Sequence, residues 1–138
     1  MNAYVDTSAL LRLVLREPHA LEDLRACERL VSSELLAVEG RRTLDRLRLA
    51  GSLSAEEVAA RITVLSEWLE AVDLVLLRAP VLARASEPLP VVLGTLDAVH
   101  LATVLVWRDR MEESLVVATH DAALGAAARA FGFEVRGV

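Results

Sequence analysis

Short apolar runs rich in β-branched residues alternate along the chain with longer stretches in which apolar positions recur every three or four residues. The runs are typical of buried strands, and the stretches are typical of amphipathic helices. Strands are predicted over Asn2–Asp6, Arg29–Ser33, Asp73–Leu77, Leu115–Thr119 and Phe133–Arg136. Helices are predicted over Ser8–Arg16, His19–Glu28, Ser33–Ala50, Ser54–Ala71, Pro80–Ser86, Thr95–Arg110 and Ala122–Phe131.

The alternation of strands and helices indicates the fold class. Strands joined through helices pair in parallel by right-handed crossovers, and short apolar strands suit a sheet covered on both faces. We therefore predict one α/β domain over residues 1–138, a three-layer α/β/α arrangement around a central parallel sheet of about five strands. Ser54 and Glu57 have the spacing of a capping box, and Gly51 suits the end of the preceding helix.

Composition bears on where the protein works. Hydrophobic residues make up 54% of the chain, which indicates a buried core. No apolar run approaches the ~20 residues needed to span a bilayer, and Asp6 interrupts the apolar stretch that a signal peptide would need. We therefore expect a cytoplasmic protein that does not bind membranes. Cys27 is the only cysteine, and we expect it to be buried and inert.

Four acidic residues stand where a parallel sheet places its ligands. Such sheets bind ligands beyond the carboxyl ends of their strands; Asp6 ends the first predicted strand and Asp121 follows the fourth. Glu39 and Asp97 lie in otherwise apolar helical segments, where an unpaired buried acid is unfavourable. A shared hard cation, Mg²⁺ or Mn²⁺, would satisfy all four acids and would suit phosphodiester hydrolysis. The net charge of −5 argues against a generic electrostatic nucleic-acid binder, although bound cations would offset most of it.

Each acid also has a purely structural interpretation. Asp6 and Asp121 suit helix N-caps, and Asp97 suits the first turn of a helix, where negative charge is favourable. Glu39 has the spacing to pair with Arg42, or with Arg46 further along the same helix face. Spacing alone leaves a metal site and these structural roles equally open.

Several blocks of the sequence resemble PIN-domain proteins, in particular the VapC toxins of bacterial toxin–antitoxin pairs. The blocks run Tyr-Val-Asp-Thr-Ser-Ala-Leu-Leu from Tyr4, Leu-Asp-Ala-Val-His-Leu-Ala-Thr from Leu96 and Thr-His-Asp-Ala-Ala-Leu from Thr119. They match the family in order and spacing over nearly the whole chain. Glu39 stands where the family places its second acid, with Glu34 as its nearest rival.

The resemblance implies a Mg²⁺- or Mn²⁺-dependent endoribonuclease that acts on RNA as a toxin. The implied catalytic and metal-binding residues are Asp6, Glu39, Asp97 and Asp121, and the implied supporting hydroxyls are those of Thr7, Ser8 and Thr119. It also implies an antitoxin partner and a homodimer. A PIN-type nuclease outside a toxin pair and a catalytically silent PIN-like interaction module remain the alternatives.

Other residues are candidates for contacts around this site. Arg12 and Arg16, one helical turn apart, suit either RNA phosphates or a solvated helix face. His100 follows Asp97 by three residues, and we interpret it as a packing residue rather than a site residue.

The predicted helix Ser54–Ala71 carries more apolar surface than one buried face needs. Its first stripe, which we expect to face the core, consists of Val58, Ile62, Leu65 and Leu69. A second stripe consists of Val64, Trp68 and Ala71. We expect Trp68 to contact the antitoxin, since tryptophan is favoured at interface centres; the alternative is that another helix of the same chain covers it.

Overall fold

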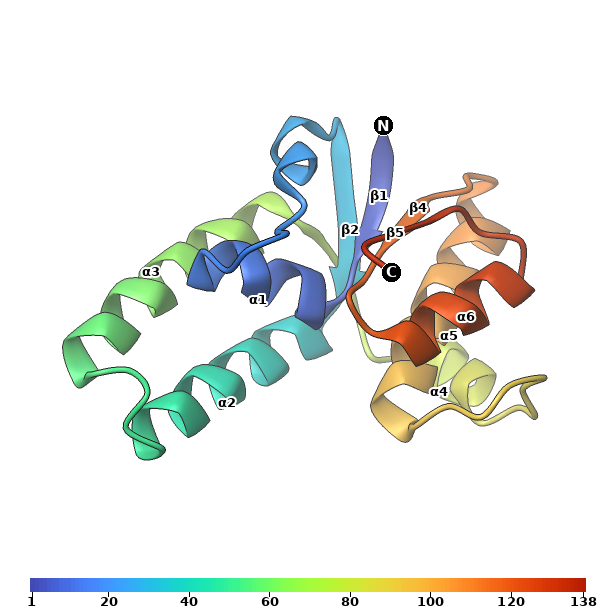
Figure 1. Ribbon diagram of the computed structural model, residues 1–138. Coiled ribbons are helices and arrows are strands. Elements are labelled where there is room, and N and C mark those ends of the chain that lie inside the picture. Colours follow the sequence, from blue (N-terminus) through green and yellow to red (C-terminus); the bar gives the residue numbers. More distant parts are fainter.

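Five parallel strands lie at the centre of the molecule, in the order β3-β2-β1-β4-β5 (Figure 1). The computed structural model describes residues 1–138. The strands are β1 (Asn2–Val5), β2 (Arg29–Ser33), β3 (Asp73–Val75), β4 (Val116–Ala118) and β5 (Val135–Arg136). Every pairing is parallel. The predicted α/β class with a parallel sheet of about five strands is confirmed.

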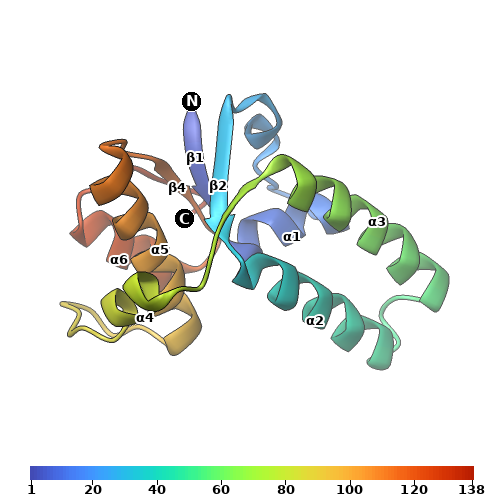
Figure 2. The same cartoon turned by 180° about the vertical axis from the view of Figure 1, so that it is seen from behind.

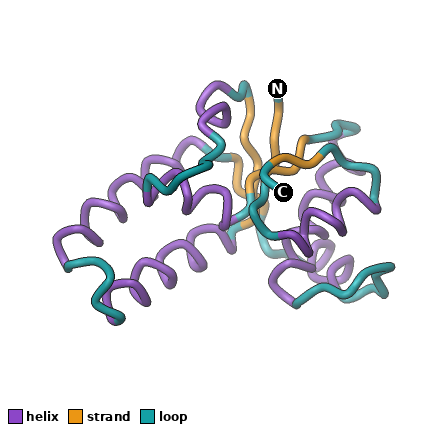
Figure 3. Tube along the Cα trace, viewed as in Figure 1, coloured by secondary structure: helices purple, strands orange, loops and turns teal.

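Helices cover both faces of this sheet (Figures 1 and 2). On one side lie α1 (Thr7–Leu15), α2 (Leu35–Leu49) and α3 (Ala55–Ala71). On the other side lie α4 (Ala79–Ala85), α5 (Thr95–Met111) and α6 (Ala122–Ala130). Figure 3 shows the strands as a central layer between the two groups. None of the helices is both long enough and apolar enough to cross a bilayer.

The alternation of side chains along β1 builds a separate core on each face of the sheet. Ala3 and Val5 pack into the core beneath α1, α2 and α3, whereas Tyr4 packs into the core beneath α5 and α6. Successive strand residues point to opposite faces, so this division follows from the pleat. Tyr4 is thereby placed on the α5 side, two residues before Asp6.

The segment between α1 and β2 differs from its prediction. Instead of a helix over His19–Glu28, it forms one short 3₁₀ helix, η1 (Glu22–Ala26), in which only Leu24 is buried. The backbone reverses direction before it, and His19 has a left-handed φ of 63° that an α-helix cannot contain. Cys27, expected to be buried, is only half-buried.

The ends of α2 and α3 follow their predictions, and the buried face of α3 follows its prediction in part, since Val58 and Leu65 are buried. Ser54 accepts a hydrogen bond from the Glu57 amide at 3.0 Å and Glu57 completes the capping box, while Gly51 has a φ of +76° just past α2. Ile62, expected in the core, is 37% exposed. Arg61, the preceding residue, is half-buried and donates to the carbonyl of Val14 at 3.0 Å.

Candidate active site

The four predicted acids line one cleft at the carboxyl ends of β1 and β4. The cleft has a volume of about 420 Å³, and its walls come from α1, α2, the first turns of α5 and the start of α6. Asp6, Glu39, Asp97 and Asp121 all contribute to its surface. The rule that parallel sheets gather ligand-binding groups at this edge therefore places the predicted residues together.

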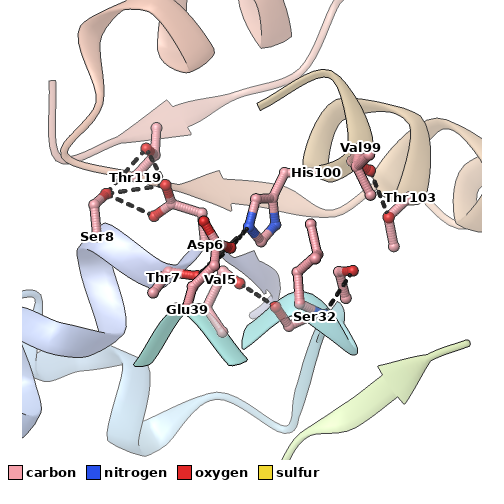
Figure 4. Close-up of polar contacts among 12 residues, drawn as sticks. Val5, Asp6, Thr7, Ser8, Ser32, Glu39, Val99, His100, Thr103 and Thr119 are labelled. Atoms are coloured by element: carbon pink, nitrogen blue, oxygen red, sulfur yellow. Dashed lines mark hydrogen bonds and ion pairs between the residues drawn. The ribbon is translucent and has the colours of Figure 1, made fainter. Parts of the chain in front are cut away.

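Asp6 joins the end of β1 to the start of α1. Its Oδ1 accepts a hydrogen bond from the Ala9 amide at 3.0 Å, so it is the N-cap of α1 as well as part of the cleft. The hydroxyls of Ser8, at 2.8 Å, and Thr119, at 2.9 Å, also donate to this carboxylate (Figure 4). Burial raises the pKa of Asp6, and these three donors oppose the rise. The carboxylate is therefore held in one orientation from three sides.

Thr119 links the two strand ends that carry acids. Its hydroxyl donates to Asp6 and accepts a hydrogen bond from the Asp121 amide at 2.9 Å. Asp121 in turn is the N-cap of α6, because its Oδ1 accepts from the Leu124 amide at 2.9 Å. The predicted supporting hydroxyls of Ser8 and Thr119 thus fix the position of one acid and the backbone of another.

Glu39 lies in the second turn of α2 and is held by two side chains from other elements. His100 Nε2 lies 2.6 Å from its Oε1, and the Thr7 hydroxyl donates to the same oxygen at 2.8 Å. Burial alone would raise the pKa of Glu39, but the hydrogen bond and charge of His100, with the Thr7 hydroxyl, lower it below its usual value. The pairing with Arg42 that its spacing allows is not formed, because Arg42 binds Asp45 instead, at 3.0 Å.

His100 is the site residue that sequence reasoning missed. It is 1% exposed, as expected for a packing residue, but its Nδ1 lies 2.6 Å from the Tyr4 hydroxyl. Its Nε2 contacts Glu39 (Figure 4). Its place one turn after Asp97 was visible in the sequence. Its partners were not, because they come from β1 and α2.

Asp97, in the first turn of α5, lies where the negative charges of the cleft are crowded together. Burial raises its pKa, and the charges of Asp121, Asp6 and Glu39 raise it further. Among these influences only His100 lowers the pKa of Asp97. The acids therefore lie close enough to repel one another.

The donor set of the cleft suits a hard divalent cation. No three His, Cys, Asp or Glu side chains are arranged to surround an ion on their own. Mg²⁺ commonly takes only one or two carboxylates and keeps several water ligands, so an open, all-oxygen set with mutual repulsion fits such a hydrated ion. Asp6, Glu39, Asp97 and Asp121 are the residues that would hold it.

Two arginines line the cleft, but they are not the pair singled out from the sequence. Arg42 and Arg46 of α2 contribute to its wall. Arg12 instead donates to the carbonyl of Pro18 at 3.3 Å. Arg16 ends α1 in a left-handed conformation and lines a separate hollow beside α3.

Glu34, the rival of Glu39, has a different position. Its Oε2 accepts a hydrogen bond from the Leu77 amide at 2.7 Å, and its own amide donates to the carbonyl of Val75 at 3.1 Å. Glu34 therefore joins the start of α2 to the end of β3 and does not line the cleft.

Comparison with known proteins identifies the family. The PIN domain family model matches residues 3–131, so the chain belongs to the PIN domain family. PIN domains are generally metal-dependent nucleases, which implies a nuclease-type function. The crystal structure of PAE2754 from Pyrobaculum aerophilum is similar over 100% of this chain and 82% of that chain, with a TM-score of 0.61 and 19% sequence identity. At that identity the likeness shows the fold alone. No curated protein sequence matches the chain with significant similarity.

Proposed function

We propose that this protein is a Mg²⁺- or Mn²⁺-dependent endoribonuclease that hydrolyses RNA phosphodiester bonds as the toxin of a toxin–antitoxin pair. The observation that carries the nuclease part is the cleft, which is lined by acids from the end of β1, from α2, from α5 and from the start of α6. The resemblance of the acidic blocks to those of VapC toxins supports the toxin part.

Some residues of the cleft would hold a cation, and others would hold RNA. When bound, the cation would supply Lewis-acid polarisation of the phosphoryl group and activation of a water molecule. Ser8 and Thr119 keep the Asp6 carboxylate in one orientation. The carboxylates also give the cleft floor a negative potential, so RNA phosphates approach it only where a cation or an arginine compensates.

Arg46 is the arginine best placed to contact a phosphate. It lines the cleft, its guanidinium donates to the Thr43 hydroxyl at 2.9 Å, and it forms no ion pair with a carboxylate. Arg42 lines the same wall but is already paired with Asp45. We therefore assign the RNA phosphate contact to Arg46, with Arg42 beside it, in place of Arg12 and Arg16.

Cleavage of a structured RNA by purified protein tests the proposal. Activity is expected with Mg²⁺ or Mn²⁺, none with EDTA, and a loss of at least a hundredfold in Asp6→Asn and Asp97→Asn. Asp73→Asn is the matched control, because Asp73 is an exposed acid that pairs with Arg29 away from the cleft; it should cleave like wild type. Undiminished cleavage in EDTA, or full activity in Asp97→Asn, contradicts the metal-dependent nuclease.

Two further outcomes separate this proposal from its alternatives. Equal cleavage of DNA, with no small antitoxin gene beside this one, favours a PIN-type nuclease outside a toxin pair. Metal binding without cleavage of any nucleic acid favours a silent interaction module.

The proposal includes an antitoxin and a second copy of the chain as partners. For the antitoxin we propose the α3 surface around Trp68, which is half-buried, has Arg25 5.2 Å above its ring, and borders a hollow of about 340 Å³. A homodimer is supported by exposed apolar residues beside β3 and at the end of α5, where Leu76 is 46% and Met111 52% exposed.

A further inference from the structure

Hydrogen bonds between Tyr4, His100 and Glu39 connect three elements of the fold beneath the cleft. Tyr4 belongs to β1 and is fully buried, His100 belongs to α5, and Glu39 belongs to α2. The two links are both 2.6 Å long, from the Tyr4 hydroxyl to His100 Nδ1 and from His100 Nε2 to Glu39 Oε1. Glu39 is thus connected to β1, which ends just before Asp6, and to α5, which carries Asp97.

Donor and acceptor capacity fixes the direction of the second link. An ionised carboxylate only accepts hydrogen bonds, and the Thr7 hydroxyl already donates to Glu39 Oε1. His100 Nε2 must therefore carry a hydrogen and donate it to Glu39. A nitrogen that carries this hydrogen has no lone pair for a metal ion, so His100 acts on Glu39 and not on a cation directly.

The first link fixes the imidazole ring itself. Around Tyr4, the Ser32 hydroxyl donates to the Val5 carbonyl and the Thr103 hydroxyl donates to the Val99 carbonyl, each at 2.6 Å. These hydroxyls have no second hydrogen to offer the His100 ring. The Tyr4 hydroxyl is therefore the hydrogen-bond partner of His100 Nδ1. Tyr4 belongs to the central strand β1 and is fully buried, so its position is fixed by the sheet.

Without His100, the Thr7 hydroxyl would be the only side-chain group that holds Glu39. Its side chain has three rotatable bonds, and it shares the cleft with the carboxylates of Asp6, Asp97 and Asp121, whose like charge repels it. A glutamate left to itself would turn toward solvent, and a cation would have to draw it back on binding. Groups held in their binding geometry beforehand bind more tightly, because less order is lost on association.

We propose that His100, anchored by Tyr4, is a positioning residue that holds the Glu39 carboxylate in the cleft and thereby sets the affinity for the divalent cation. This rests on the proposed function, in which Glu39 is a cation ligand. His100 contacts neither the RNA nor the cation in this role. Its loss therefore lowers metal affinity while leaving the rate at saturating metal nearly unchanged.

Mn²⁺ binding measured by calorimetry, alongside cleavage rates over a range of Mn²⁺ concentrations, tests the proposal. His100→Leu should weaken Mn²⁺ binding about tenfold or more, the usual effect of removing a residue that supports a metal ligand. Cleavage at saturating Mn²⁺ should return close to the wild-type kcat. His100→Gln, whose amide nitrogen can replace Nε2 as a donor, should bind Mn²⁺ close to wild type. His19→Gln is the matched control, because His19 is exposed and lies outside the cleft.

Three results would overturn the proposal. The first is unchanged Mn²⁺ affinity in His100→Leu, and the second is a loss of kcat that saturating Mn²⁺ does not restore. If a thermal melt shows that His100→Leu does not fold, Tyr4→Phe takes its place as the test variant, since it removes only the hydroxyl that anchors His100. Wild-type Mn²⁺ affinity in Tyr4→Phe is the third.

Failure of the proposed function has a different signature. Asp6→Asn and wild type would then bind Mn²⁺ alike, whatever the result for His100.

Discussion

At the cleft, Asp6 and Glu39 differ from Asp97 in how their carboxylates are held. Asp6 accepts hydrogen bonds from Ser8, Thr119 and the backbone of α1, and Glu39 accepts from His100 and Thr7. Asp97 has no comparable donors, and burial and neighbouring charge raise its pKa. Two acids are thus fixed in advance, while Asp97 carries the repulsion that a cation would relieve.

This repulsion predicts the effect of Asp97→Asn on stability. An acid whose pKa is higher in the folded than in the unfolded protein destabilises the fold when ionised, and the penalty disappears as the pH falls through the raised pKa. In EDTA at pH 7, Asp97→Asn should therefore melt at a higher temperature than wild type, by about 3–5 °C for each ~1 kcal/mol relieved.

The difference between Asp97→Asn and wild type should shrink toward acid pH, where Asp97 of the wild type becomes protonated. Asp109→Asn, an exposed acid near the end of the same helix, serves as the control and should show no such gain. An unchanged or lower melting temperature for Asp97→Asn would mean that the acids of the cleft do not repel one another.

At the scale of elements, close packing of α2 against α3 sets where Glu39 lies. Gly40, the next residue of α2, is buried against Leu65 of α3, which is itself fully buried. A Cβ atom at Gly40 would lie 2.9 Å from Cδ2 of Leu65. The absence of a side chain at this position lets the two helices approach, and that approach helps direct the neighbouring Glu39 into the cleft.

Gly40→Val should therefore destabilise the fold and disturb the site together. Overpacking of this kind destabilises by about 1–3 kcal/mol, measured as a lower midpoint of urea unfolding with an unchanged slope. Gly40→Ala should have a smaller effect, because about 1 kcal/mol of helix propensity offsets its contact with Leu65. Ala59→Val, on the exposed face of α3, adds similar bulk without this contact. If it destabilises as much as Gly40→Val, close helix approach is not the cause.

Much of the fold is predictable from the sequence, because it depends on residues that lie close together along the chain. The capping box at Ser54 and the apolar runs of the strands are signals within a few positions, and they lie where predicted. The 3₁₀ segment η1 and the exposure of Ile62 were not predictable in this way. They depend on how the chain reverses after α1 and on Arg61 reaching a carbonyl of that helix.

The site shows the same division at the scale of the whole molecule. The topological rule for parallel sheets brings strand-end acids such as Asp6 and Asp121 to one edge, so their proximity is predictable. The contact between Tyr4 and His100 joins residues 96 positions apart. It depends on the rotation of α5 against β1, which no local pattern specifies. Arg46 replaces Arg12 at the cleft for a similar reason, since the angle of α2 decides which arginines face it.

The proposed antitoxin surface gives a prediction that separates binding from catalysis. Trp68 lies on the side of α3 that faces η1 and is not among the residues of the cleft. Trp68→Ala should weaken antitoxin binding by more than ~1 kcal/mol while leaving metal-dependent cleavage unchanged, as measured by calorimetry and an RNA cleavage assay. Glu70→Ala, an exposed residue of α3 that does not line the hollow beside Trp68, is the control for local disturbance. Full antitoxin affinity in Trp68→Ala would place the interface elsewhere.

Linkage between cation binding and folding gives a prediction for the whole molecule that requires no substrate. The acids that line the cleft come from the end of β1, from α2, from α5 and from the start of α6, so the set exists only when the chain is folded. A ligand that binds only the folded state stabilises it by about 2.7 kcal/mol at a hundredfold excess over its Kd. Mg²⁺ or Mn²⁺ should therefore raise the melting temperature of wild type but not of Asp6→Asn.

Asp73→Asn, which leaves the cleft intact, should follow wild type. Equal shifts in wild type and Asp6→Asn would mean that the cations act on the general surface charge, and the four acids would then be N-caps and helix charges without a shared ion.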